Sequence, residues 1–143
     1  MAAPALLSDL PKGHEFPATE LQITAEDVSV YLDAVQDADS VYRDLGFAPP
    51  LAVAARALGA LLDLIELPPG TLHTGQQIES AAGVPLGAAL TLSARVVQRS
   101  ERAGLIIFAI EFEVTVAPAP AEKMPAPALT GKTTMMVSAG AAP

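Results

Sequence analysis

The chain contains no cysteine and no tryptophan, and charged residues make up only 17% of its 143 residues. The lack of cysteine excludes disulfide bonds, thiolate metal sites and cysteine nucleophiles. Basic residues are also few, since eight Lys and Arg stand against sixteen Asp and Glu and give a net charge of −8. A surface of this sign repels phosphate backbones, so we expect no nucleic-acid partner. An anionic ligand would need a local group of basic side chains.

Apolar runs long enough to cross a membrane are also lacking. The longest apolar stretch, residues 51–65, contains Arg56 and Asp63. As a helix it would span about 22 Å, which is short of the roughly 30 Å hydrocarbon core of a bilayer. The N-terminus has neither a basic start nor a long apolar run, so it does not resemble a signal peptide. We expect a cytoplasmic protein without a membrane partner.

Hydrophobic residues, in contrast, are abundant and make up 51% of the chain. A chain of this length and composition can bury most of its apolar surface in one domain without a disulfide. We expect an N-terminal tail over residues 1–13 and a single domain over residues 14–139. Within this domain, residues 117–127 are rich in proline and alanine. This composition predicts a loop, because proline fits neither a helix interior nor a strand ladder.

The first half of the chain has the pattern of one strand followed by helices. We expect a strand over residues 14–23, and Thr24 with the acidic residues behind it marks a helix start. A second helix is expected over residues 51–65, and a turn at residues 67–70 ends it. That helix is apolar nearly all round, so it needs cover on most sides. The first helix carries an apolar stripe at Val28, Tyr31, Leu32 and Val35.

In the second half of the chain the apolar period changes to two, which predicts strands. Residues 90–97 and 105–116 flank a turn at residues 102–104, so we expect a long antiparallel hairpin with one buried side. Residues 72–80 and 129–137 supply two further strands. One strand, then helices, then four antiparallel strands predict an α+β fold. In this fold a five-stranded antiparallel sheet wraps around the apolar helix.

Residues 31–44 resemble the signature of the MaoC-like (R)-specific enoyl-CoA hydratases and β-hydroxyacyl dehydratases. That signature runs roughly Tyr-x-x-x-x-Gly-Asp-x-Asn-Pro-Ile-His-x-Asp, and the chain has Tyr-Leu-Asp-Ala-Val-Gln-Asp-Ala-Asp-Ser-Val-Tyr-Arg-Asp. Asp37 stands at the place of the catalytic aspartate, and Tyr42 stands at the place of the catalytic histidine. Three further positions depart from the family's glycine, asparagine and proline: Gln36, Asp39 and Ser40.

The resemblance extends over most of the chain, from about residue 16 to residue 137. Ala48, Pro49 and Pro50 resemble the Ala-Pro-Pro that opens the central helix of the family. His73 and Gln76 lie in a segment similar to the Leu-His-x-x-Gln strand of the dehydratase half related to fungal fatty-acid synthase. A later family pattern, proline followed four residues on by Gly-Asp, is half lost, with Gly83, Gly87 and Ala88 in its place. The resemblance implies the hotdog fold.

In the family, an Asp/His pair holds the water that adds to a trans-2-enoyl thioester, while a proton is delivered to Cα. Backbone N–H donors near the start of the central helix polarise the thioester carbonyl. A tyrosine side chain has a reference pKa near 10, so about one in a thousand is ionised at pH 7. A histidine has a reference pKa near 6.5, and this difference of roughly 3.5 pKa units makes the proton-accepting form of tyrosine about 5 kcal/mol less favourable to prepare. Tyr42 is therefore a poor base, although its neutral hydroxyl can donate a hydrogen bond.

Structural roles compete with each of these functional roles. Asp37 can cap a turn or helix end, and Tyr42 can simply pack against its neighbours. His73 can be a relocated acid or base if a dimer carries its strand to the site, or it can be structural. Three arginines near one end of the hairpin can meet coenzyme A phosphates across a dimer, or they can be solvated: Arg95, Arg99 and Arg102.

Three functions remain open at this point. The resemblance favours a protein that binds acyl thioesters with impaired or absent catalysis, as the non-catalytic partner of a hydratase pair. One alternative is an active hydro-lyase that adds water to a trans-2-enoyl thioester with Asp37 and either His73 or Tyr42. Another is a non-enzymatic scaffold or regulatory subunit. We expect no cofactor and no metal, an acyl-CoA or acyl carrier protein thioester as ligand, and a homodimer or a heterodimer with another hotdog subunit. Expected substrate-binding residues are Ala48, Pro49, Pro50, Gln76, Arg95, Arg99 and Arg102.

Overall fold

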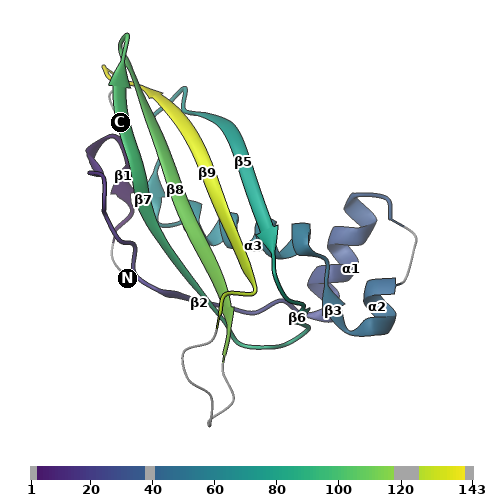
Figure 1. Cartoon of the computed structure of the whole chain (residues 1–143). Coiled ribbons are helices and arrows are strands. Elements are labelled where there is room, and N and C mark those ends of the chain that lie inside the picture. Colours follow the sequence, from purple (N-terminus) through teal and green to yellow (C-terminus); the bar gives the residue numbers. More distant parts are fainter. Residues whose placement is uncertain (1–2, 38–40, 118–125, 141–143) are drawn as a thin grey trace.

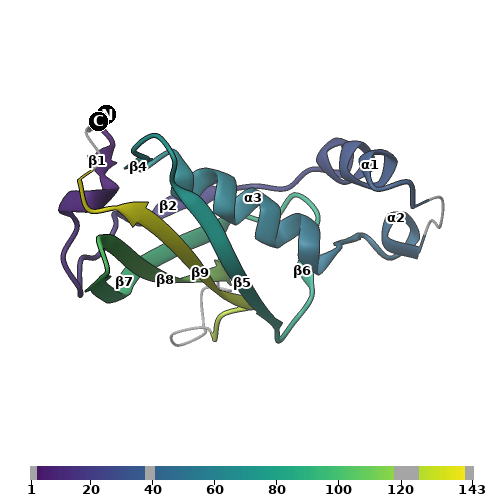
Figure 2. The same cartoon turned by 90° about the horizontal axis from the view of Figure 1, so that it is seen from above.

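A computed structural model describes residues 3–37, 41–117 and 126–140 of the chain (Figure 1). Its main body is a five-stranded sheet in which every pairing is antiparallel. Helix α3 (Pro50–Leu62) lies against one face of this sheet (Figure 2). The expected α+β architecture, with an antiparallel sheet curved around a central helix, is confirmed. The strands, in spatial order, are β2 (Thr19–Leu21), β7 (Leu90–Arg102), β8 (Leu105–Val116), β9 (Leu129–Ser138) and β5 (Leu72–Ser80).

Shorter elements surround this body. Two helices, α1 (Ala25–Ala34) and α2 (Val41–Leu45), lie beyond the N-terminal end of α3, on the right of Figure 1. Two short antiparallel strands beside them, β3 (Phe47–Ala48) and β6 (Val84–Pro85), connect this end of the molecule to the sheet. The remaining elements are β1 (Ala5–Leu6), a 3-10 turn (Leu7–Asp9) and β4 (Ile65–Glu66).

The first strand of the sheet is shorter than the expected residues 14–23. Before β2 begins, the Gly13 and Phe16 N–H groups already donate to carbonyls of β7, at 2.7 and 3.0 Å. Pro17 follows these contacts, and proline has no N–H to donate to a ladder. The segment therefore contacts the edge of β7 in two short stretches rather than as one continuous strand.

The central helix ends three residues before the expected boundary at residue 65. Ile65 belongs to β4, which pairs in parallel with β1 near the N-terminus. The same N-terminal segment places Leu7 and Leu10 among the buried core side chains. Part of the segment that we expected to be a tail therefore packs on the domain. Residues 118–125 of the proline-rich loop lie outside the described residues.

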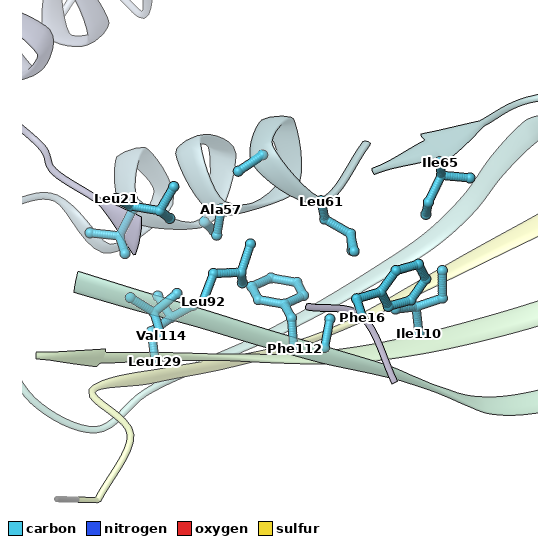
Figure 3. Close-up of a cluster of buried hydrophobic side chains, with 14 of the residues drawn as sticks. Phe16, Leu21, Ala57, Leu61, Ile65, Leu92, Ile110, Phe112, Val114 and Leu129 are labelled. Carbon is cyan, nitrogen blue, oxygen red and sulfur yellow. The ribbon is translucent and has the colours of Figure 1, made fainter. Parts of the chain in front are cut away.

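The core lies between α3 and the inner face of the sheet (Figure 3). Ala57 and Leu61 point from the helix towards Phe112 of β8. A Cβ added at Gly131 of β9 would overlap the Phe112 ring, so only glycine fits beneath this ring. On the side of α3 that faces away from the sheet, Leu51 is 61% exposed. The helix is therefore covered on its sheet side, while an apolar stripe opposite remains open.

Candidate functional site

Helix α1 begins with a reciprocal capping box. The Asp27 N–H donates to the Thr24 hydroxyl at 3.1 Å, and the Thr24 N–H donates to the Asp27 carboxylate at 2.9 Å. The hydrogen bond from the Thr24 backbone to the carboxylate, and after it one from the Thr24 side chain, hold the pKa of Asp27 below its ordinary value of 3.8. Val28 and Leu32 then bury one face of the helix in the core. The capping box thus fixes where α1 starts and how it is seated.

The end of α1 turns the chain towards the signature aspartate. Gln36 adopts a left-handed conformation with φ +58°, and the Asp37 N–H donates to the Leu32 carbonyl at 2.9 Å. Helices commonly end in such a residue, which is usually glycine because glycine has no Cβ to strain. This is the position where the family signature has glycine, so the structure gives a conformational reason for that preference. Asp39 and Ser40 lie outside the described residues.

Asp37 and Tyr42 line the same cavity, which has a volume of about 530 Å³. Both side chains are half-buried, and Pro49 and Pro50 contribute the wall at the start of α3. A volume of roughly 300–1,000 Å³ is typical of small-molecule sites. The structure therefore brings together four of the residues that the sequence singled out. The remaining lining residues are Tyr31, Leu32, Val35 and Leu51.

A second, smaller cavity of about 130 Å³ lies beside the first and shares Tyr42 and Pro50 with it. It is enclosed by α3, by the β3–β6 pair and by the ends of β5 and β9. Ala48, which we expected to contact substrate beside Pro49, lines this cavity instead of the larger one. The other residues along it are Phe47, Val53, Ser80, Ala82, Gly83, Val84 and Leu129.

His73 and Gln76 do not line either cavity. The His73 Nε2 lies 3.1 Å from both the Gly75 carbonyl and the Gln76 Oε1, and that Oε1 accepts a hydrogen bond from the buried Thr133 hydroxyl at 2.8 Å. His73 precedes Ser80, which lines the smaller cavity, by seven residues. At roughly 3.3 Å per strand residue, His73 and Ser80 are on the order of 20 Å apart along β5. Within one chain, His73 is therefore distant from Asp37.

The three arginines do not form one group. A bulge between Val96 and Gln98 reverses the alternation of β7, so Arg95 and Arg99 lie on opposite faces of the sheet. Arg95 lies opposite Glu111 on the outer face. Arg99 lies over the Phe108 ring, at 5.6 Å, and donates to the Ser8 carbonyl at 3.2 Å, which fastens the N-terminal segment.

Arg102, at the hairpin turn, is exposed and lies opposite Leu105. It lines neither cavity, and the same holds for Arg95 and Arg99. Within one chain, these arginines therefore do not belong to the wall of either cavity. Their role in binding stays a prediction.

Other kinds of site find no support in the part of the chain that the structure describes. No cluster of three or more His, Asp or Glu residues there is placed to hold a metal ion. None of the helices in residues 3–37, 41–117 and 126–140 has the length and apolar character needed to cross a membrane.

Several wall residues were missed by the sequence reasoning, and Leu51 and Phe47 are two of them. Leu51 lines the larger cavity and Phe47 the smaller one, but Leu51 was expected only as part of the apolar helix and Phe47 was given no role. Both are large apolar side chains that remain exposed, at 61% and 41%. The signal that could have found them is their position beside Ala48, Pro49 and Pro50, which the resemblance had already assigned to substrate binding.

No protein-family model matches the sequence, and neither does any curated protein. Solved structures do resemble this one. A MaoC-like dehydratase from Rhodospirillum rubrum matches with a TM-score of 0.70 at 15% identity, over 96% of this chain and 97% of the other. An (R)-hydratase from A. caviae involved in PHA biosynthesis matches with a TM-score of 0.67 at 16% identity, over 89% of this chain and 96% of the other.

A third match is to a C-terminally truncated HadBC complex, a (3R)-hydroxyacyl-ACP dehydratase from Mycobacterium tuberculosis. Its TM-score is 0.71 at 19% identity, over 92% of this chain and 100% of the other. At identities this low, the likeness establishes a common fold and does not by itself transfer an activity. The chain has the hotdog fold that MaoC-like dehydratases and (R)-hydratases also have.

Proposed function

We propose that this chain is a MaoC-like protein that binds acyl thioesters, has impaired or absent hydratase catalysis, and acts as the non-catalytic partner of a hydratase pair. One observation carries the proposal. The cavity that joins Asp37 to the start of α3 has Tyr42 at the position of the signature histidine. Among the described residues that line this cavity, none is a histidine. The cavity thus retains a binding site while the expected base is replaced.

Binding of an acyl thioester is supported by the walls of the larger cavity. Val35 and Leu51 offer exposed apolar surface, and burying an acyl chain against such surface contributes roughly 25 cal/mol per Å². The N-terminal end of α3 begins at this cavity, and the positive end of a helix dipole favours a polarised carbonyl oxygen. The Tyr42 hydroxyl adds a possible hydrogen-bond donor. The site therefore offers both an apolar wall and a polar end.

Loss of catalysis is supported by the identity and position of the titratable groups. Asp37 remains at the cavity and can hold a water molecule. Tyrosine is mostly neutral at pH 7, so it does not take a proton from that water efficiently. His14 packs edge-on against the Phe16 ring, with ring centroids 4.8 Å apart, in the segment that contacts β7. His73 is held on β5, away from the cavity.

A partner subunit is supported by the open edge of the sheet. Among the described strands, β5 pairs only with β9, so its other edge can accept another strand. An apolar stripe on α3, which lies behind β9 and β5 in Figure 1, is only partly covered, with Leu51 and Ala55 exposed and Leu58 and Leu62 half-buried. A second hotdog subunit that continues the sheet at β5 would also cover this stripe. The match to the HadBC complex shows that a similar fold is found in a two-subunit dehydratase.

The second candidate function is an active hydro-lyase, and one observation favours it. If two copies pair their β5 edges antiparallel, the His73 end of one strand approaches the Ser80 end of the other. Ser80 lines the smaller cavity together with Tyr42. A second copy could then supply the missing imidazole. Rapid hydration of crotonyl-CoA by the chain alone, abolished in His73→Asn, would establish this function in place of the first.

The test of the proposed function is a calorimetric titration with butyryl-CoA. We expect the wild-type chain to bind, and Leu51→Glu to weaken binding about tenfold or more because it places a charge in the apolar wall. Leu45→Glu is the matched control, since Leu45 is also 61% exposed but does not line either cavity. No binding by the wild-type chain would favour the scaffold function without a thioester ligand.

A further inference from the structure

The larger and smaller cavities are neighbours with a common wall. Tyr42 and Pro50 line both of them, and Pro50 is fixed in the first turn of α3. Tyr42 lies in α2, outside the α3–sheet core, and its side chain is half-buried. Of the two shared residues, Tyr42 is therefore the one whose side chain extends between the cavities and whose size can be changed without altering the central helix.

The wall of the smaller cavity is buried and apolar where α3, β6 and β9 form it, while its lining residues from the end of β5 to Gly83 are exposed. Val53, Val84 and Leu129 are each at most 3% exposed, so packing holds them in place. Phe47 lies against Gly83, where an added Cβ would stand 2.9 Å from the Phe47 Cδ1. The ring thus rests directly on the backbone of the loop that leads into β6. This side of the cavity is closed, and a chain that comes from the larger cavity would have to pass Tyr42.

We propose that Tyr42 limits the length of the acyl chain that the larger cavity accepts, because its ring closes off the smaller cavity. This inference rests on the proposed function, namely that the larger cavity binds acyl thioesters. An apolar cavity of about 150 Å³ holds a benzene molecule, so the smaller cavity, at about 130 Å³, has room for roughly six carbon atoms. In the wild-type protein this room stays unused by the ligand. The residue that occupies the histidine position therefore also determines specificity.

The length limit depends on the ring of Tyr42 and not on its hydroxyl group. Tyr42→Phe keeps the ring and removes the hydroxyl, whereas Tyr42→Ala removes both and joins the two cavities. If the hydroxyl also donates to the thioester, Tyr42→Phe weakens all acyl-CoA ligands by a similar factor and leaves the dependence on length unchanged. The two variants therefore separate the steric role of Tyr42 from a polar one.

The experiment is a set of titrations with saturated acyl-CoA thioesters from butyryl to hexadecanoyl. Each methylene buried in the site raises the affinity about fourfold, and further methylenes that remain in solvent add little. We expect the affinity of the wild-type protein and of Tyr42→Phe to rise with chain length and then level off at the same length. In Tyr42→Ala the affinity should keep rising to a chain length about four to six carbons longer before it levels off.

A double variant tests whether the added length enters the smaller cavity. Ala82 is exposed and lines that cavity, so Ala82→Leu in the Tyr42→Ala background fills it again from the other side. In this variant the affinity should again level off at the same chain length as in the wild type. Methyl NMR gives the location directly, because long acyl chains should shift the Val53 and Val84 methyl signals in Tyr42→Ala and leave them unchanged in the wild type.

The same length dependence in Tyr42→Ala and the wild type, with folding confirmed by unchanged circular dichroism, would overturn the inference and leave the proposed function intact. A shift to longer chains that is equally large in Tyr42→Phe would overturn it too, because the ring would then not be the barrier. If the wild-type chain binds no acyl-CoA of any length, the proposed function fails and the inference falls with it.

Discussion

At the scale of single residues, Gln36 and Tyr42 show two different consequences of a departure from the hydratase signature. Gln36 replaces a glycine at a position whose left-handed φ of +58° favours glycine for conformational reasons. Tyr42 replaces a histidine at a position whose requirement is chemical, since it lies at the cavity beside Asp37. We expect the first change to affect the free energy of unfolding, and the second to affect the reaction that the cavity can support.

Replacing Gln36 by glycine should therefore stabilise the protein. A left-handed conformation costs a residue with a Cβ roughly 1–2 kcal/mol, part of which is offset by the greater flexibility of glycine in the unfolded chain. We expect Gln36→Gly to raise the free energy of unfolding by about 1 kcal/mol, measured by urea denaturation. Ala34→Gly, two residues earlier and inside α1, should lower it by about 1 kcal/mol. A loss of stability in Gln36→Gly would show that the side chain makes a compensating contact.

Replacing Tyr42 by histidine should increase hydration of enoyl-CoA. The change restores the spacing between aspartate and histidine in the signature and supplies a group that titrates near neutrality. A general acid or base contributes about 10²- to 10⁴-fold, so in a cavity not refined for catalysis we expect a gain of about 10- to 1,000-fold. Tyr42→Phe should give no gain. If folded Tyr42→His is as inactive as the wild type, the donors that polarise the thioester are missing too, and the scaffold function gains support.

At the scale of secondary-structure elements, the regular patterns of the sequence predicted most of the fold. The capping residues at Thr24 placed the start of α1, and the period-two pattern placed β7, β8 and β9, because both signals are local. One error arose where a distant segment decides the structure, since Ile65 pairs with β1 instead of continuing the central helix. The other has a local cause, because Pro17 interrupts the first strand and has no N–H to donate. The bulge after Val96 could not be read from the alternation, so the positions of the arginines relative to the two faces were not predictable.

The capping box of α1 predicts a dependence of stability on pH. The pKa of Asp27 is lower in the folded chain than its ordinary value of 3.8, so folding favours the ionised form. The stabilisation is therefore fully present above the unfolded pKa and is lost as the pH falls through the folded pKa. Wild type should exceed Asp27→Asn in stability near neutral pH, and the difference should shrink between about pH 5 and pH 2.

Urea denaturation at a series of pH values measures this difference. Glu26→Gln is the matched control, because Glu26 also lies in the first turn of α1 but takes no part in the capping box. It should show a smaller difference from the wild type over the same range of pH. A difference between wild type and Asp27→Asn that grows towards acid pH would contradict the assigned direction of the pKa shift.

At the scale of the whole molecule, the open edge of β5 and the apolar stripe of α3 are the basis of our proposal that the chain associates with another subunit. We expect the chain alone to form a homodimer at micromolar concentration, with a sedimentation mass about twice its 14.7 kDa. Ala55→Glu places a charge on the exposed stripe and should shift the mass to that of a monomer. Ala18→Glu, at an exposed position before β2, should leave the dimer intact. A wild-type mass near that of one chain would contradict this expectation.

The candidate site was predictable from the sequence in part. Asp37, Tyr42, Pro49 and Pro50 were expected together and line one cavity, because the chain between them is short and the proline pair fixes the start of α3. The division into two cavities was not predictable, since Gly83 and other walls of the smaller one come from distant segments. The positions of His73 and Gln76, far along β5, depend on the register of the sheet.

The central claim is that this cavity binds an enoyl thioester without hydrating it efficiently, and the most direct test measures both events on one preparation. Wild-type protein is titrated with crotonyl-CoA to obtain the affinity, and hydration of the same ligand is followed by the loss of its conjugated absorbance. We predict saturable binding that Leu51→Glu weakens, together with a hydration rate close to that of the buffer. Rapid wild-type turnover that Asp37→Asn abolishes would contradict the claim and show that the native site is catalytic.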